Sequence, residues 1–248
     1  MPSLRLSRPF VLAGFLALVC AFTLAGDAIP DQPRIGMEDP SWRLVSSADG
    51  IALYSGSVPK VGVVPLKAVM TIPGTIEEVA MVLEDISRRG EWISNFAQSV
   101  LLERPNAYDQ TEYLRVYLPW PSQNRTAVIR AQVAVSDDLR RATISAESVD
   151  SHLADGLPRI VRASVYTSTF QMTQVEGHVE VVALIFIDPC GSIPKWIVNY
   201  FSRRAARATL AALRRQVARE LYSSSQLAAM RQRIEGYRAF RTGVPRSS

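Results

Sequence analysis

One strand–turn–helix segment, residues 179–199, constrains the fold more than any other part of the chain. Apolar side chains occupy most of its first nine positions on both faces, which predicts a strand that is buried on two sides. Asp188 and Pro189 end this strand, because proline cannot donate a hydrogen bond to a sheet and disfavours helix at the residue before it. Pro194 suits the first turn of a helix, which we expect over residues 194–222.

The earlier segments favour long strands and one short helix. Thr75 and Glu78 have the spacing of a helix capping box, and Gly90 is placed to end the helix that they begin, at about residues 88–89. Apolar patterns predict a strand pair over residues 42–58 and strands over residues 66–72, 99–104, 110–118, 126–136, 141–148, 160–173 and 178–188. This order indicates an α+β domain over residues 41–222, followed by a basic amphipathic helix and a disordered tail over residues 223–248.

Two motifs stand out along this domain. The turn and helix after the last strand read Asp-Pro-x-Gly-x-Ile-Pro-x-Trp-x-Val-Asn over residues 188–199, and Leu-Pro-Trp-Pro over residues 118–121 is followed by Arg125, Val128 and Arg130. Weaker motifs lie at Trp42, Asp49, Gly50, Ile51, Tyr54, Leu83, Glu84, Asp85, Glu91, Trp92, Val161 and Arg162. Together, and in this order along the chain, the motifs resemble those of the bacterial START (StAR-related lipid-transfer) domains. Two positions depart from that family: Thr126 stands where Asp is usual, and Phe170 where Trp is common.

The resemblance implies a helix-grip fold. In this α+β arrangement a curved antiparallel sheet wraps around a long C-terminal helix and encloses a hydrophobic cavity. The resemblance also implies one lipid ligand, a phospholipid, fatty acid or sterol, that passes the C-terminal helix as it enters. No metal or cofactor is expected, since His152, His178 and Cys190 have no spacing typical of a metal site or of a nucleophile and its base.

A carboxylate lies on the apolar face of one predicted strand. Alternation over residues 110–118 puts Glu112 on the same face as Leu114 and Val116. An unpaired charge buried on such a face is very costly, so Glu112 needs a partner or a proton. A salt bridge at the strand edge would satisfy it equally well.

By the resemblance, the partner of Glu112 in the cavity would be Arg130. The alternation of residues 126–136 nevertheless puts Arg130 on the opposite face from the apolar set. A β-bulge could redirect it, and Arg125 and Arg162 are alternative partners.

These considerations give two sets of candidate residues. The predicted ligand-binding residues are Trp92, Glu112, Leu114, Val116, Trp120, Arg130, Ile197 and Phe201. Trp120, held between two prolines, fits the rim of the cavity or a membrane interface on the one hand, or the core on the other. The predicted contacts with an anionic membrane surface are Arg203, Arg204, Arg207, Arg214 and Arg215, which could equally form a solvated helix face.

The N-terminus has the pattern of a secretory signal peptide. Arg5 and Arg8 precede a mostly apolar run over residues 10–25, and small residues follow. We expect residues 1–28 to be cleaved and residues 29–40 to form a linker, which fits export to a bacterial periplasm. An uncleaved membrane anchor is the alternative. Removal of the signal would leave Cys190 as the only cysteine, so no intrachain disulfide is expected.

The charge is unevenly distributed. Residues 203–246 contain eleven arginines and two glutamates, whereas residues 29–202 contain fifteen basic and twenty acidic residues. This favours an acidic domain body with a basic C-terminal part. Export and the lack of a base-reading motif exclude nucleic acid as the expected partner of these arginines, and we expect a monomer.

The sequence therefore predicts an exported lipid-binding or lipid-transfer protein that catalyses no reaction. Two alternatives remain at this point. The chain could be a helix-grip enzyme, cyclase-like or hydrolase-like, in which buried Glu112 acts as a general base. It could also be an interaction protein whose arginine-rich C-terminal part binds a partner when ligand is present.

Overall fold

A ten-stranded sheet forms the centre of the computed structural model, which describes residues 32–118, 122–157 and 160–242. Its order is β1-β2-β3-β10-β9-β7-β6-β5-β4, with neighbouring strands antiparallel, and β8 pairs with β6 in parallel off this path. The strands are β1 (Arg43–Ala48), β2 (Ile51–Ser55), β3 (Leu66–Pro73), β4 (Phe96–Asn106), β5 (Asp109–Val116), β6 (Arg125–Val135), β7 (Arg141–Ser148), β8 (Val161–Arg162), β9 (Ser164–Val175) and β10 (His178–Asp188).

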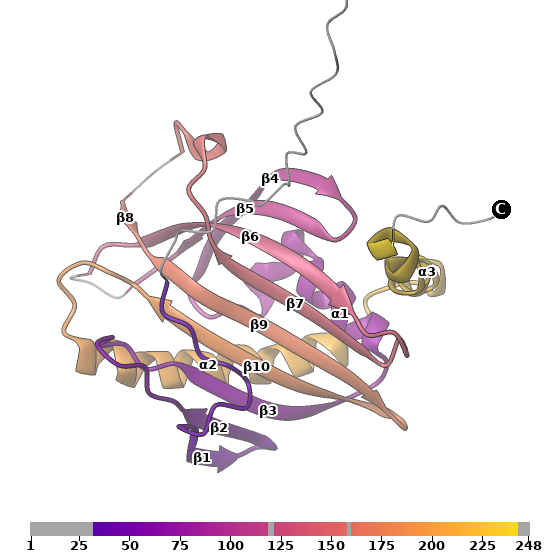
Figure 1. Cartoon of the computed structure of the whole chain (residues 1–248), viewed down its shortest axis with the longest axis horizontal. Helices are drawn as coiled ribbons and strands as arrows, with labels where there is room; N and C mark the ends of the chain where they lie inside the picture. Colours follow the sequence, from indigo (N-terminus) through magenta and orange to yellow (C-terminus); the bar gives the residue numbers. More distant parts are fainter. Residues whose placement is uncertain (1–31, 119–121, 158–159, 243–248) are drawn as a thin grey trace, which may run out of the picture.

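Three α-helices and two 3-10 helices accompany the sheet: α1 (Ile76–Glu84), η1 (Ile86–Glu91), η2 (His152–Ala154), α2 (Lys195–Val217) and α3 (Ser224–Thr242). The long helix α2 lies along one face of the sheet, and α3 lies near α1 at one end (Figure 1). The result is the expected α+β architecture with a large antiparallel sheet and C-terminal helices. No helix in the described ranges has both the length and the apolar character needed to cross a membrane.

Several sequence-based predictions match closely. Strands β7 and β10 have the bounds expected from their patterns. The capping box is present, since the Thr75 side chain accepts a hydrogen bond from the backbone N–H of Glu78 and the Glu78 carboxylate accepts one from the Thr75 N–H at 2.7 Å. Local chemistry suffices here, because each signal lies within a few residues of the structure it determines.

Several strand boundaries shift by up to three residues, such as those of β4, and three other differences are larger. The helix that starts at Thr75 ends at Glu84 rather than near Gly90, because the Asp85 carboxylate caps a separate 3-10 helix by accepting from Ser87 N–H at 3.0 Å. Helix α2 ends at Val217 rather than at residue 222, and Glu220 adopts a left-handed conformation with φ of 50°. The strand expected over residues 160–173 is divided into β8 and β9.

The main core lies between α2, α1 and one part of the sheet. Leu210 and Leu213 of α2 are fully buried and belong to one cluster with Met70 of β3 and Val79 of α1. Helix α2 packs mainly against α1, β2 and β3. The same cluster extends to β6, β7 and β9 through Val135, Ala142 and Met172.

Polar contacts hold α2 along this edge of the sheet. The Asn199 side chain accepts from Val64 N–H at 2.9 Å and donates to the Gly62 carbonyl at 3.3 Å, which ties the start of α2 to the chain before β3. Further along, Arg207 and Arg214 donate to the carbonyls of Ala48 and Asp49, at 2.9 and 2.7 Å, in the turn between β1 and β2. Helix α2 is thus positioned at both ends by residues far away in the sequence.

We predict that Leu210→Ala lowers the free energy of unfolding by about 2–5 kcal/mol, because it leaves a cavity where α2 meets the sheet. Exposed Arg204 on the same helix provides the control, and Arg204→Ala should change stability by less than about 0.5 kcal/mol. Urea denaturation of both variants measures the difference. Equal stability of the two variants would contradict the placement of α2.

Candidate functional site

The inner face of β5 and β6 carries a strip of apolar side chains. Across the two strands Leu114 pairs with Ala127 and Glu112 pairs with Ile129, so these side chains share one face. Ala127 and Ile129 are buried, whereas Leu114 and Val116 are only half-buried although they share this inner face. Leu114 and Val116 therefore keep part of their apolar surface accessible to solvent.

The strip continues onto neighbouring strands with mostly short side chains. Its buried residues form a cluster of their own, separate from the main core: Ala127, Ile129, Ala131, Ala146 and Val165. Alanine and valine have short side chains and fill little of the space above the sheet. The arrangement gives β6, β7 and β9 an apolar cluster on this face that is separate from the main core around α2.

A buried polar network marks the β4–β5 end of this surface. Glu112 is fully buried, and Arg89 of η1 donates to both of its carboxylate oxygens, with Nη2 to Oε1 at 2.9 Å. Ser99 Oγ donates to Glu112 Oε2 at 3.1 Å, and the Gln110 amide donates to Oε1. Arg104 in turn donates to the Gln110 side-chain carbonyl.

This network corrects the expected pairing of Glu112 with Arg130. Because Glu112 is opposite Ile129 in the strand register, the adjacent Arg130 points to the other face of the sheet, where it binds Asp109 with Nε to Oδ1 at 2.8 Å. The alternation had indicated this face, and no bulge redirects the side chain. The sequence offered no signal for Arg89, because η1 approaches β5 only through the tertiary fold.

The other proposed partners have different roles. Arg125 donates to the carbonyls of Pro189 and Cys190, in the turn that follows β10, and burial lowers its pKa. Arg162 donates to the Val149 carbonyl at 2.6 Å and forms an ion pair with Asp150. Both arginines fasten loops rather than approach Glu112.

The start of α2 exposes three aromatic side chains. Trp196 is 73% exposed, Tyr200 56% and Phe201 52%, and the Tyr200 and Phe201 rings are in edge contact with centroids 5.3 Å apart. Ile197 is half-buried. Ile197 and Phe201 are both predicted ligand contacts on this helix. Phe201 is exposed at the surface, and Ile197 is partly buried.

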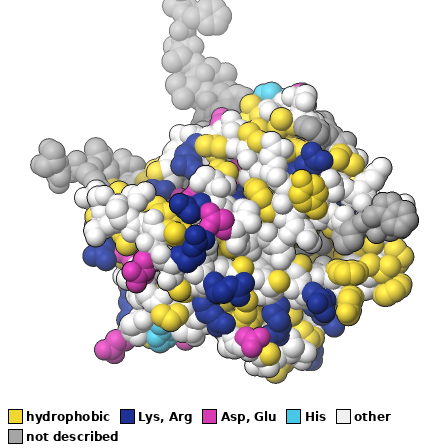
Figure 2. All heavy atoms as spheres, turned by 180° about the vertical axis from the view of Figure 1, so that it is seen from behind, with side chains coloured by type: hydrophobic (Ala, Val, Ile, Leu, Met, Phe, Trp, Pro, Cys, Tyr) yellow, Lys and Arg dark blue, Asp and Glu magenta, His cyan; other side chains and the backbone are white. Residues whose placement is uncertain are grey.

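The predicted membrane-contact arginines separate into two groups. Arg207 and Arg214 donate to the β1–β2 turn, so they are not the free cations that the pattern indicated. Arg203, Arg204 and Arg215 are exposed and have no partner among the described residues. Figure 2, seen from the side of α2, shows Lys and Arg side chains along this face and hydrophobic side chains grouped near one end.

Of the two predicted ligand-binding tryptophans, the structure describes only Trp92. Trp92 is buried in the main core, and its indole N–H has no hydrogen-bond partner among the described residues. Trp120 lies outside the described residues. Within the described ranges no group of three or more His, Cys, Asp or Glu side chains could hold a metal ion.

The comparisons with known proteins agree with this geometry. The family model described as START domain matches residues 32–219, so the chain belongs to the START family. An uncharacterized protein of Pseudomonas aeruginosa, PA1579, is 25% identical over 194 residues, which cover 78% of this chain and 90% of that protein.

Solved structures share the fold. A STAR-related lipid transfer protein fragment from Xanthomonas axonopodis is 25% identical, with a TM-score of 0.62 over 72% of this chain and 99% of the fragment. Human STARD10 is 19% identical, with a TM-score of 0.66 over 83% of this chain and 82% of that chain. Human StAR-related lipid transfer protein 5 is 16% identical, with a TM-score of 0.68 over 74% and 89%.

We predict that Arg89→Met destabilises the protein by about 3–5 kcal/mol, because it leaves the Glu112 carboxylate buried without its cation. The double variant Arg89→Met/Glu112→Leu should be more stable than this single variant, since it removes the uncompensated charge. Urea denaturation of Arg89→Met, of Glu112→Leu and of the double variant tests the interaction. A double variant that loses the sum of both single losses would contradict the interaction.

Proposed function

We propose that this protein binds one hydrophobic ligand on the inner face of β5, β6, β7 and β9 and transfers it between membranes. The observation that carries the proposal is the cluster of mostly short apolar side chains on this face, separate from the main core around α2, in a START-family chain. Apolar ligand surface gains about 25 cal/mol for each Å² removed from water. Phospholipid, fatty acid and sterol all satisfy this chemistry, and two of the structural relatives are themselves described as lipid transfer proteins.

The polar network has a structural part in this proposal. Glu112 accepts four hydrogen bonds, from Arg89, Ser99 and Gln110, so its lone pairs are engaged within the protein. A general base needs a free lone pair within reach of substrate, which argues against the enzymatic alternative. We assign to Glu112 the joining of η1 to β5 at the polar end of the ligand site.

The start of α2 is the proposed gate and membrane contact. Lys195 forms an ion pair with Asp188 at 2.8 Å, Asn199 binds the chain before β3, and Val198 is buried in a small apolar cluster, so these are the contacts that opening of the gate would break. Exposed Trp196 and Phe201 suit the membrane interface, and Arg203 and Arg204 suit anionic head groups. Docking of this end would bring the ligand site to the bilayer.

Export remains part of the proposal. Residues 1–28 lie outside the described residues, and the proposed cleaved signal peptide would deliver residues 29–248 to a bacterial periplasm. The mass of the protein from a periplasmic fraction tests this directly. A protein of full mass that stays with the membrane fraction would instead establish the uncleaved anchor.

We predict that Ala131→Trp reduces lipid transfer between vesicles at least tenfold, because the indole occupies the apolar surface where ligand binds. Ala134→Trp is the matched control, since Ala134 lies on the same strand with an exposed side chain on the opposite face. Fluorescent-lipid transfer is measured for both after thermal unfolding has confirmed that they fold. Equal transfer rates would contradict the location of the site.

We predict that Arg203→Gln/Arg204→Gln weakens binding to anionic vesicles by roughly 30-fold, from about 1 kcal/mol for each arginine near the surface. Arg140→Gln/Arg141→Gln is the control with the same charge change at the β6–β7 turn. Vesicle flotation at low and high salt measures both. A larger loss in the control variant would move the membrane contact away from α2.

A further inference from the structure

Two serine side chains lie on the inner face of the sheet beside the apolar cluster. Ser168 of β9 is opposite Ala146 of β7. Ser148 of β7 is opposite Ile129 of β6, so both serines share the face of the cluster residues Ala146 and Ile129. Ser168 is half-buried and Ser148 is only 2% exposed, so each hydroxyl lies among apolar side chains with limited access to water.

The hydrogen-bonding capacity of both hydroxyls is incompletely used. Ser148 Oγ accepts from the Val165 N–H at 2.8 Å, but its own hydrogen has no acceptor among the described residues. The Ser168 hydroxyl forms no hydrogen bond with any residue in the described ranges. Buried polar groups are nearly always hydrogen-bonded, and an unpaired one is costly. A ligand that supplies an acceptor would satisfy both serines.

The other polar side chains on this face have partners within the protein. Glu112 accepts from Gln110 and from Arg89. Arg125 donates to carbonyls of the turn after β10, and Gln174 accepts from the backbone N–H at the start of α1 at 2.8 Å. Within the described parts of β5, β6, β7 and β9, the two serine hydroxyls are therefore the O–H donors on the inner face that are left for a ligand.

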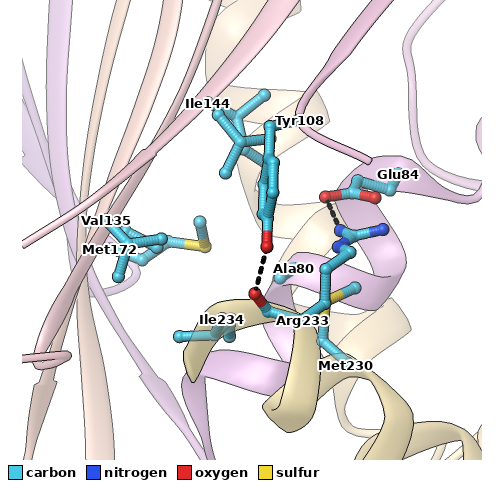
Figure 3. A pocket seen from close by; sticks show the side chains of 11 residues that line it. Ala80, Glu84, Tyr108, Val135, Ile144, Met172, Met230, Arg233 and Ile234 are labelled. Atoms are coloured by element: carbon cyan, nitrogen blue, oxygen red, sulfur yellow. Dashed lines mark hydrogen bonds and ion pairs between the residues drawn. The ribbon is translucent and has the colours of Figure 1, made fainter. Parts of the chain in front are cut away.

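The end of the inner face near α3 differs in this respect. Figure 3 shows the Tyr108 hydroxyl pointing toward the Arg233 carbonyl, to which it donates at 2.7 Å, and the Arg233 side chain beside Glu84, with which it forms an ion pair. The sheet contributes the apolar side chains of Ile144 and Met172 there. The polar groups at this end bind one another, whereas the two serines are available to a ligand.

The two serines are close enough to bind one polar group. Because Ala146 is directly opposite Ser168, Ser148 is the diagonal neighbour of Ser168 across β7 and β9, with Cα atoms about 7–8 Å apart. Two O–H donors at this spacing suit an acceptor with two lone pairs, such as a carbonyl or carboxylate oxygen. A ligand hydroxyl suits them less well, because its own hydrogen would need a further acceptor on this apolar face.

We propose that Ser148 and Ser168 form a subsite for the acyl carbonyl of the bound lipid, in the carboxyl group of a fatty acid or in the ester of a glycerolipid. This inference rests on the proposed lipid-binding function and names the chemical group by which the ligand is recognised. The subsite is separate from the Glu112 network, in which both carboxylate oxygens are bound within the protein. Binding of the carbonyl at this point fixes the position of the ligand along β7 and β9.

Ester and ether lipids of equal chain length test the subsite, because they differ in the carbonyl oxygen. The probe is a vesicle with equal amounts of diacyl and dialkyl phosphatidylglycerol, and native mass spectrometry of the purified protein measures the ratio of the two lipids bound. Wild-type protein should favour the diacyl lipid. Ser168→Ala should reduce this preference about fivefold through the loss of one hydrogen bond, and Ser148→Ala should reduce it as well.

Ser145→Ala is the matched control, since Ser145 is half-buried on β7 and lies on the opposite face from Ser148. A reduced preference in both inner-face variants, with none in the control, supports the inference and assigns the carbonyl to an ester. Weaker binding of free palmitic acid by the same two variants supports it and assigns the carbonyl to a fatty acid.

An unchanged lipid ratio in Ser168→Ala, together with undiminished binding of palmitic acid, overturns the inference and leaves the proposed function intact. An equal loss in Ser145→Ala also overturns the inference. A wild-type protein that binds none of these lipids overturns the proposed function with it.

Discussion

The packing of Leu210 and Leu213 fixes α2 over β2 and β3. The position of α2 determines which part of the sheet belongs to the main core. A helix centred over the whole sheet would fill its inner face with side chains. Here Asn199, at the start of α2, binds the chain before β3, and Arg207 and Arg214 bind the β1–β2 turn. These hydrogen bonds hold the helix near the β1–β3 side of the sheet. The inner face of β6, β7 and β9 carries a separate cluster of mostly short apolar side chains, which suits the proposed lipid site.

The buried ion pair of Arg89 and Glu112 stabilises the border of that region. Because the carboxylate is fully buried, its charge is tolerated only with a cation and further donors beside it. This requirement holds η1 against β5 and keeps the polar end of the site in a single arrangement. The pair therefore lies at the border of the proposed site, with both oxygens of the carboxylate hydrogen-bonded within the protein.

The sequence predicted those features whose signals are local. The capping box at Thr75 and the bounds of β10 depend on neighbouring residues, and the START motifs identified the family and the α+β fold through the order and spacing of their residues. The partner of Glu112 could not be predicted in this way, because Arg89 is brought to it by the packing of η1 on the sheet. The excess of C-terminal arginines also overstated the free charge, since Arg207, Arg231 and Arg233 are engaged within the protein.

Native mass spectrometry of the purified protein after incubation with vesicles of mixed phospholipid, fatty acid and sterol tests the central claim most directly. The proposed function predicts one lipid bound to each chain, released intact by organic extraction and absent from Ala131→Trp. A folded wild-type protein that takes up none of these lipids would contradict it.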